Sequence, residues 1–237
     1  MLEPDIQVNI DFPPVITRVG REKTPVIVID DFVANVDEFA RYACDQVSFE
    51  AEKITMYPGV RAKLARKNVV QLLNPLLPLL YQTYSIPTGR RPKPKNYVYS
   101  LVAMSGHDLN TLQRVPHVDS NLPHYLAMTH YLNSGKHGGT GLFRHRPTGF
   151  ENITESRRSE FGRSADAYIA NNGQPASGYI IASDGHFELL EVIDYRPNRL
   201  VIYPGSLLHS GMIDPITDIS SDPRAGRLTA NIFVNFE

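Results

Sequence analysis

The sequence predicts a mostly β protein with a helical flank, arranged as a sandwich or barrel. From residue 96 onward, short segments rich in β-branched and aromatic residues follow one another, and turn residues separate nearly all of them. No regular helices alternate with these segments, as a parallel sheet with crossover helices would require. Apart from one insert after residue 145, the helical patterns lie before residue 96, and 237 residues are enough to bury the core of one domain.

The first half of the chain predicts a strand followed by helices. Residues 24–32 form a β-branched run that ends in turn residues. Asn35 is placed to cap a following helix, with Glu38 three residues later, and this helix puts Cys44 on its buried face. Residues 62–84 predict two short helices that are interrupted near Asn74 and Pro75.

Residues 88–95 combine glycine, prolines and basic residues, and they interrupt all periodicity. We therefore expect a single domain over residues 1–237, in which residues 1–95 support a β core formed by residues 96–237. An insert at about 146–185 contains a helical segment or lid at 154–171. The remaining segments predict strands, at 97–104, 124–132, 141–145, 187–194, 199–203 and 228–236.

Composition excludes several classes of function. The formal net charge is -1 and the pI is about 6.7, so no global field attracts nucleic acid. The apolar stretches are too short and too interrupted to cross a membrane, and the acidic N-terminal residues do not resemble an export signal. Cys44 is the single cysteine, which excludes an internal disulfide and fits a cytoplasmic protein. Any bound metal must then rely on His, Asp and Glu side chains.

His117 and Asp119 form the first candidate metal-binding pair. In an extended backbone, residues two apart point to the same face, so both side chains can reach one ion. The pattern is common, and a hydrogen-bonded pair on a surface loop explains it equally well.

His209 is the second candidate, because a strong strand and a Pro-Gly turn present it among apolar neighbours. Together with His117 and Asp119 it would supply two imidazoles and one carboxylate. Such a set leaves three positions of an octahedral ion open, which is the arrangement of non-haem iron(II) oxygenases, whereas zinc prefers four ligands with one open position. A buried core histidine is the alternative for His209.

The last predicted strand places Arg227, Thr229 and Asn231 on one face. An inward-facing arginine requires an anion, and its planar guanidinium suits two-point recognition of a carboxylate. The alternative is that Arg227 lies in water at the rim of the barrel. Arg224 competes for the same role, but it adjoins Pro223 outside the alternating strand.

Together these motifs resemble the iron(II)/2-oxoglutarate dioxygenase superfamily, in particular its prolyl-4-hydroxylase-like branch. The resemblance covers about the C-terminal half of the chain and includes residues 129–133 (Thr-His-Tyr-Leu-Asn) and 138–143 (Gly-Gly-Thr-Gly-Leu-Phe). Order and spacing agree, and four motifs in sequence are far more specific than one. The link from His209 to Arg227 is longer than is usual for this branch.

The resemblance implies a double-stranded β-helix, that is, a jelly-roll or cupin-like barrel. It implies Fe(II) held by His117, Asp119 and His209, and 2-oxoglutarate as the cosubstrate. Arg227, Thr229 and Tyr131 would bind that cosubstrate, with Tyr131 and Arg227 at its distal carboxylate.

The reaction implied by the resemblance consumes O2 and releases succinate and CO2. Because Asp119 supplies a carboxylate ligand, hydroxylation is expected rather than halogenation. The substrate is a peptidyl or amino-acid side chain or a small metabolite, and the oligomeric state stays open, with a homodimer compatible. Two other functions stay open: a barrel that binds a metal or small ligand without turnover, and a zinc hydrolase, which lacks an obvious general base near the motif.

The other histidines and arginines have weaker roles in this interpretation. His124 and His130 are expected to be packed or hydrogen-bonded. Four histidines lie in loop-like sequence and are expected in solvent, namely His107, His137, His145 and His186. Five arginines could recognise a substrate carboxylate or form a solvated helix face, namely Arg144, Arg146, Arg157, Arg158 and Arg163.

Overall fold

The computed structural model describes residues 3–9, 11, 13–51 and 57–237. Its strands form an eight-stranded and a three-stranded sheet, and all paired neighbours are antiparallel. The larger sheet contains, in spatial order, β1 (Val15–Val19), β2 (Thr24–Ile29), β9 (Leu200–Pro204), β6 (Tyr125–Tyr131), β11 (Leu228–Phe236), β5 (Pro92–Val102), β4 (Gly59–Lys63) and β3 (Glu50–Ala51). The smaller sheet contains β10 (His209–Gly211), β7 (Thr140–His145) and β8 (Phe187–Ile193).

The path of the chain between the two sheets defines the fold. From β5 to β11 the chain passes repeatedly from one sheet to the other, and the centre of the larger sheet has the order β5-β11-β6-β9. The backbone at His117 adds to the smaller sheet through a bridge to His209, beside β10, β7 and β8. This interleaving is that of a double-stranded β-helix, so the predicted fold class is confirmed.

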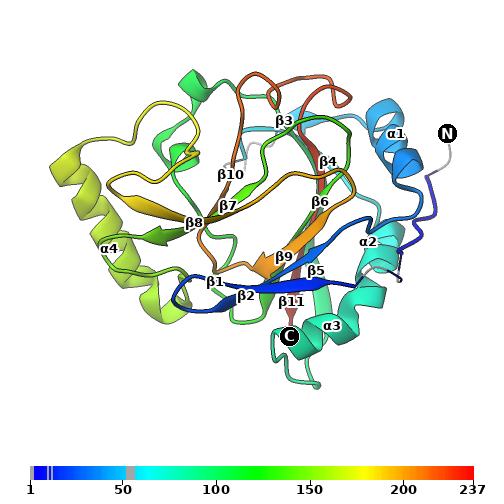
Figure 1. The fold of residues 1–237 in the computed structure, drawn as a ribbon, viewed down its shortest axis with the longest axis horizontal. Coiled ribbons are helices and arrows are strands. Elements are labelled where there is room, and N and C mark those ends of the chain that lie inside the picture. Colours follow the sequence, from blue (N-terminus) through cyan, green and yellow to red (C-terminus); the bar gives the residue numbers. More distant parts are fainter. Residues whose placement is uncertain (1–2, 10, 12, 52–56) are drawn as a thin grey trace.

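Helices cover the molecule on two sides (Figure 1). The helices α1 (Val36–Gln46), α2 (Arg66–Leu73) and α3 (Leu77–Thr83) lie against the larger sheet, and α4 (Glu155–Asn172) lies beside the smaller one. Short 3-10 turns complete the set, at Asn74–Leu76, Gly106–Asp108 and Thr111–Arg114. None of the helices in the described ranges has both the length and the apolar character needed to cross a bilayer.

Each face of the larger sheet has its own apolar core. The outer face packs against α1, α2 and α3 through residues such as Phe39, Leu72 and Leu80. The inner face packs against the smaller sheet, where Tyr131 and Leu142 belong to one cluster. Side chains therefore alternate between two buried faces along each strand. The inner face carries polar side chains in addition to apolar ones.

Neighbouring strands align a row of polar side chains on this inner face. Thr229 of β11 lies opposite Ser100 of β5 on one side and Tyr131 of β6 on the other. In β4, Arg61 lies opposite Ser100 and extends the row. The register thus brings residues from four strands to one wall of the barrel.

Two predicted boundaries in the first half were wrong. Gly59–Lys63 is strand β4, so helical structure begins at Arg66 and not at 62, and β5 already begins at Pro92 inside the segment predicted as a break. Strand β1 was not predicted. β1 lies at one edge of the larger sheet and β4 lies next to the other edge, whereas β5 lies inside the sheet. In each case the strand conformation depends on pairing with a neighbour, which local sequence patterns do not encode.

The helix after Asn35 was predicted correctly, but its cap differs. The Asn35 side chain does not cap the helix. It accepts from the backbone N–H of Gln7 at 3.1 Å and donates to Glu38 at 3.1 Å and to the carbonyl of Asp5 at 2.9 Å. Asn35 therefore fastens the N-terminal segment to α1.

Candidate metal centre

Backbone pairing sets the two candidate histidine ligands side by side. The N–H of His117 donates to the carbonyl of His209 at 2.9 Å, and the N–H of His209 donates to the carbonyl of His117 at 3.0 Å. Residues paired in this way project their side chains to the same face, and the two imidazole centroids lie 4.4 Å apart. Two histidines distant in sequence thus meet as one cross-strand pair.

The Pro-Gly turn after β9 positions the third candidate ligand. The N–H of Asp119 donates to the carbonyl of Gly205 at 2.8 Å. A Cβ on Gly205 would lie 2.6 Å from the ring of Tyr125 and 3.5 Å from the Cβ of Asp119. Glycine therefore lets the turn pack directly against the ring of Tyr125 while its carbonyl holds the backbone of Asp119.

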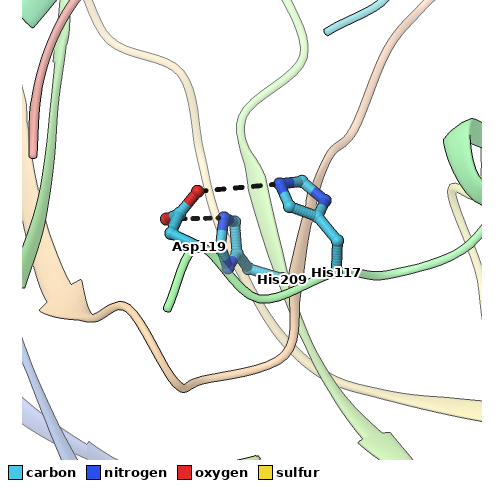
Figure 2. Close-up of side chains that lie close together, drawn as sticks. All are labelled: His117, Asp119 and His209. Carbon is cyan, nitrogen blue, oxygen red and sulfur yellow. Dashed lines mark ion pairs between the residues drawn. The ribbon is translucent and has the colours of Figure 1, made fainter. Parts of the chain in front are cut away.

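The three side chains point toward one another (Figure 2). Their donor atoms all lie within 4.8 Å of one another, with Oδ1 of Asp119 at 4.0 Å from Nε2 of His117 and Oδ2 at 3.4 Å from Nε2 of His209. The Asp119 and His209 side chains are 14% and 7% exposed, whereas that of His117 is 55% exposed. The site is therefore closed behind Asp119 and His209 and open to solvent beside His117.

The tautomer of His209 is assigned by its backbone contact. Its Nδ1 lies 2.8 Å from the carbonyl oxygen of Leu207, and because a carbonyl only accepts, Nδ1 must carry the proton. Burial lowers the pKa of His209 to about 4, so the ring is neutral at pH 7 and Nε2 presents a lone pair toward Asp119. Such a second contact is typical of histidines that bind metals.

Asp119 presents a carboxylate oxygen to this lone pair with no proton donor between them. Its Oδ2 is buried and has no hydrogen-bond partner in the described part of the chain. Burial raises the pKa of Asp119 to about 6, so it is largely ionised at neutral pH. A lone pair and an anionic oxygen at 3.4 Å repel each other, and a cation bound between them would turn that repulsion into attraction.

The pKa of His117 is lowered as well, first by desolvation and then by the neighbouring His209. Because more than half of its side chain is exposed, we expect a smaller lowering than for His209. Two neutral imidazoles and one carboxylate therefore form the donor set. The residues fit an octahedral divalent cation with an open face.

Arg227 is buried across the barrel, and it does not lie at a solvated rim. It is 6% exposed, and its guanidinium carbon lies 5.3 Å from the ring centroid of Tyr131. Its Nε donates to the carbonyl of Gly138 at 2.6 Å and its Nη2 to that of Gly139 at 3.2 Å. Arg224 instead lies at the surface and pairs with Asp45.

Thr229 and Tyr131 lie in the same region as Arg227. Asn231 donates to the hydroxyls of Thr229 and Ser100, each at 2.9 Å. The hydroxyl of Tyr131 lies 2.7 Å from that of Thr140. The structure thus brings the three predicted cosubstrate residues together on the inner face.

The sequence analysis missed two residues at this wall. Arg61 places its guanidinium 4.3 Å from the ring centroid of Tyr57, and its charge lowers the pKa of both His117 and Asp119. The Tyr57 hydroxyl is buried close to Arg227. Neither residue lies in a recognisable motif, and only the alternation in β4 could have placed Arg61 inward.

Three histidines expected in solvent are buried, which corrects the prediction. His145 and His186 are 0% and 5% exposed, with their Nε2 atoms 2.9 Å apart, and His186 stacks on Tyr168 of α4 at 4.0 Å. The side chain of His137 is 4% exposed and contacts Asp218. His107 is exposed as expected.

Two arginines proposed as carboxylate readers already have acidic partners. Arg144 is buried and pairs with Glu151 at 2.5 Å and Glu188 at 2.7 Å. Arg157 pairs with Glu22 at 2.8 Å. Arg144 therefore fastens β7 to its surroundings and does not serve as a substrate contact.

The fold and site define a class of protein: a mostly antiparallel double-stranded β-helix that carries a His-Asp-His arrangement suited to a metal. The chain belongs to a family of unknown function, DUF6445, whose model matches residues 11–234. No curated protein matches it significantly.

Solved structures show distant similarity. HygX from Streptomyces hygroscopicus, crystallised with nickel and 2-oxoglutarate, is 13% identical over 90% of this chain and 84% of its own, with a TM-score of 0.46. With hygromycin B also bound, it is 14% identical over the same shares, with a TM-score of 0.44. AviO1 from Streptomyces viridochromogenes Tue57 is 11% identical over 95% and 88% of the two chains, with a TM-score of 0.43. At this distance the assignment of the site rests on its own geometry.

Proposed function

We propose that this protein is an Fe(II)- and 2-oxoglutarate-dependent oxygenase that hydroxylates a peptidyl or amino-acid side chain or a small metabolite. One observation carries the proposal: the lone pair of His209 and the anionic oxygen of Asp119 face each other at 3.4 Å in a buried pocket that His117 completes. A cation between the two atoms would turn their repulsion into attraction, and a buried carboxylate oxygen without a partner is otherwise costly.

The residues would divide the work between metal and cosubstrate. His117, Asp119 and His209 would occupy one face of the ion and leave the opposite face for ligands. Arg227 has three N–H groups beyond those given to Gly138 and Gly139, enough for two-point binding of the distal carboxylate of a 2-oxo diacid.

Burial of the same wall would support the chemistry. Tyr131 and Thr229 offer hydroxyls beside Arg227, and both residues are almost fully buried. Bound iron and 2-oxoglutarate would supply O2-driven oxidation, coupled to release of succinate and CO2. The protein would exclude water from the closed side of the site and orient the reactants.

We propose the substrate class and the cytoplasmic location as part of the same function. A small molecule or peptide fits the net charge better than nucleic acid does. A reducing cytoplasm would keep iron ferrous and suits the single cysteine.

Anaerobic titration tests the proposal directly. Adding Fe(II) and then 2-oxoglutarate to the protein should produce the weak visible charge-transfer band of the chelate, and admitting O2 should release succinate. His209→Ala should abolish both signals, whereas His107→Ala, which removes an exposed histidine of the 3-10 turn Gly106–Asp108, should keep them.

The alternatives give different results. A barrel that binds metal without turnover would show iron binding and no succinate. A zinc hydrolase would be active with zinc under anaerobic conditions and would not respond to 2-oxoglutarate. A folded wild-type sample without the band would exclude the oxygenase.

A further inference from the structure

The segment that links β10 to β11 folds around one buried carboxylate, Asp218. This side chain is 0% exposed. Its oxygens accept the backbone N–H of Gly138 at 3.0 and 3.1 Å and that of Asp214 at 2.8 Å. They also lie 3.0 Å from Nδ1 of His137 and 3.3 Å from the hydroxyl of Thr217. These contacts make Asp218 the residue around which the segment is organised.

The same segment also holds Arg227 through hydrogen bonds. The carbonyl of Asp218 accepts the backbone N–H of Arg227 at 3.0 Å. Gly138, whose N–H is held by the Asp218 carboxylate, accepts Nε of Arg227 with its own carbonyl at 2.6 Å. Gly138 therefore connects the carboxylate of Asp218 to the guanidinium of Arg227, and a shift of either group would move Gly138.

A series of aromatic contacts also links Arg227 to Asp218. Arg227 lies over Tyr131, and Tyr131 stacks on Tyr195 with centroids 4.6 Å apart. Tyr195 in turn meets the edge of His137 at 4.9 Å, and His137 contacts Asp218. The contacts thus form a closed series that runs from Arg227 through the aromatic residues to Asp218 and returns through Gly138. This series fixes the position and the orientation of the guanidinium.

The charges support the same function. Burial raises the pKa of Asp218, but hydrogen bonds from His137 and from the N–H groups of Asp214 and Gly138, with the charge of Arg227, outweigh it and lower the pKa overall. The carboxylate is therefore ionised and offsets the cost of burying Arg227 before any anion binds. Asp218 acts on Arg227 through Gly138, so the guanidinium N–H groups beyond those given to Gly138 and Gly139 can face Tyr131 and a ligand.

We propose that Asp218, supported by His137, is the positioning residue that holds Arg227 ready for the distal carboxylate of 2-oxoglutarate. This inference rests on the proposed function. It predicts that removing the Asp218 charge weakens the binding of oxo acids that carry a distal carboxylate. The affinity for oxo acids that lack a distal carboxylate should not change.

Two ligands in one assay test this. Wild-type protein and Asp218→Asn are loaded with Fe(II) without oxygen and titrated with 2-oxoglutarate, and separately with pyruvate, which chelates in the same way but has no distal carboxylate. Asp218→Asn should raise the Kd for 2-oxoglutarate by roughly tenfold or more, as loss of a supporting charged contact does, with iron and pyruvate affinities unchanged. Asp222→Asn, in the same segment but more than half exposed, is the matched control and should bind as wild type.

Two further variants separate positioning from general damage. Combining Asp218→Asn with Arg227→Gln should weaken 2-oxoglutarate no further than Arg227→Gln alone, because both changes act through one guanidinium. His137→Gln should cause a smaller loss of the same selective kind, and it serves if Asp218→Asn does not fold. Equal weakening of 2-oxoglutarate and pyruvate, or additive effects in the double variant, would overturn the inference. Absence of the band in wild-type protein would instead reject the proposed function itself.

Discussion

Tyr131 of the larger sheet and Thr140 of the smaller sheet are joined by a hydrogen bond of 2.7 Å between their hydroxyls. The ring of Tyr131 also supports Arg227. Tyr131 therefore has two separable roles, one through its hydroxyl and one through its ring.

Tyr131→Phe should separate these roles. We expect a loss of about 1 kcal/mol in the free energy of unfolding from the lost hydrogen bond, measured by urea denaturation. Binding of 2-oxoglutarate should weaken less than in Arg227→Ala, since the ring stays beneath the guanidinium and a charged contact contributes more than a neutral one. Equal losses in the two variants would show that the hydroxyl, and not the arginine charge, dominates binding.

His209→Ala and Arg227→Ala should fail in different ways. His209→Ala removes a metal ligand and should abolish Fe(II) binding, whereas Arg227→Ala should keep Fe(II) binding and mainly raise the 2-oxoglutarate requirement. Calorimetric titration with Fe(II), followed by 2-oxoglutarate, measures both steps. If the two variants lost iron affinity equally, Arg227 would be misassigned.

Metal binding should weaken as pH falls through about 6. The pKa of Asp119 in the metal-free protein is raised to about 6 by burial, and a proton on this carboxylate competes with the ion at lower pH. Affinity for Mn(II) should therefore be nearly constant from pH 8 to 7 and should fall by about tenfold per pH unit below 6. Constant affinity down to pH 5, with the fold intact by circular dichroism, would contradict this.

Gly138→Ala should damage both folding and cosubstrate binding. A Cβ at this position would lie 1.5 Å from the carbonyl oxygen of Met212, so the backbone must move, at a cost of about 1–3 kcal/mol or more. Urea denaturation measures the loss. Gly89→Ala is the control, because its Cβ would meet nothing within 4 Å, and similar losses in both variants would show that close packing at Gly138 is unimportant.

Much of the fold followed from local patterns. Alternation predicted six of the core strands within a few residues, and proline and asparagine marked the break between α2 and α3. The strands that were missed or shortened are β1, β3, β4, β10 and the start of β5, and each pairs with a neighbour in its sheet. β3 and β10 are only two and three residues long, and β4 and the start of β5 contain glycine, prolines and basic residues, so their sequences do not indicate a strand without that pairing. The β-branched residues of β1 do favour a strand, which the prediction overlooked.

The sequence by itself determined which side chains can share a face: His117 with Asp119, and Arg227 with Thr229, because two-residue alternation is a local property of the strand. Only the tertiary structure decided that His117 pairs with His209, that Arg227 is held by Gly138 in front of Asp218, and that His145 and His186 are buried. These relations depend on sheet register and on loops that connect distant segments. The physical reason is that burial and long-range pairing are set by the whole packed chain, whereas periodicity is set by a few neighbouring residues.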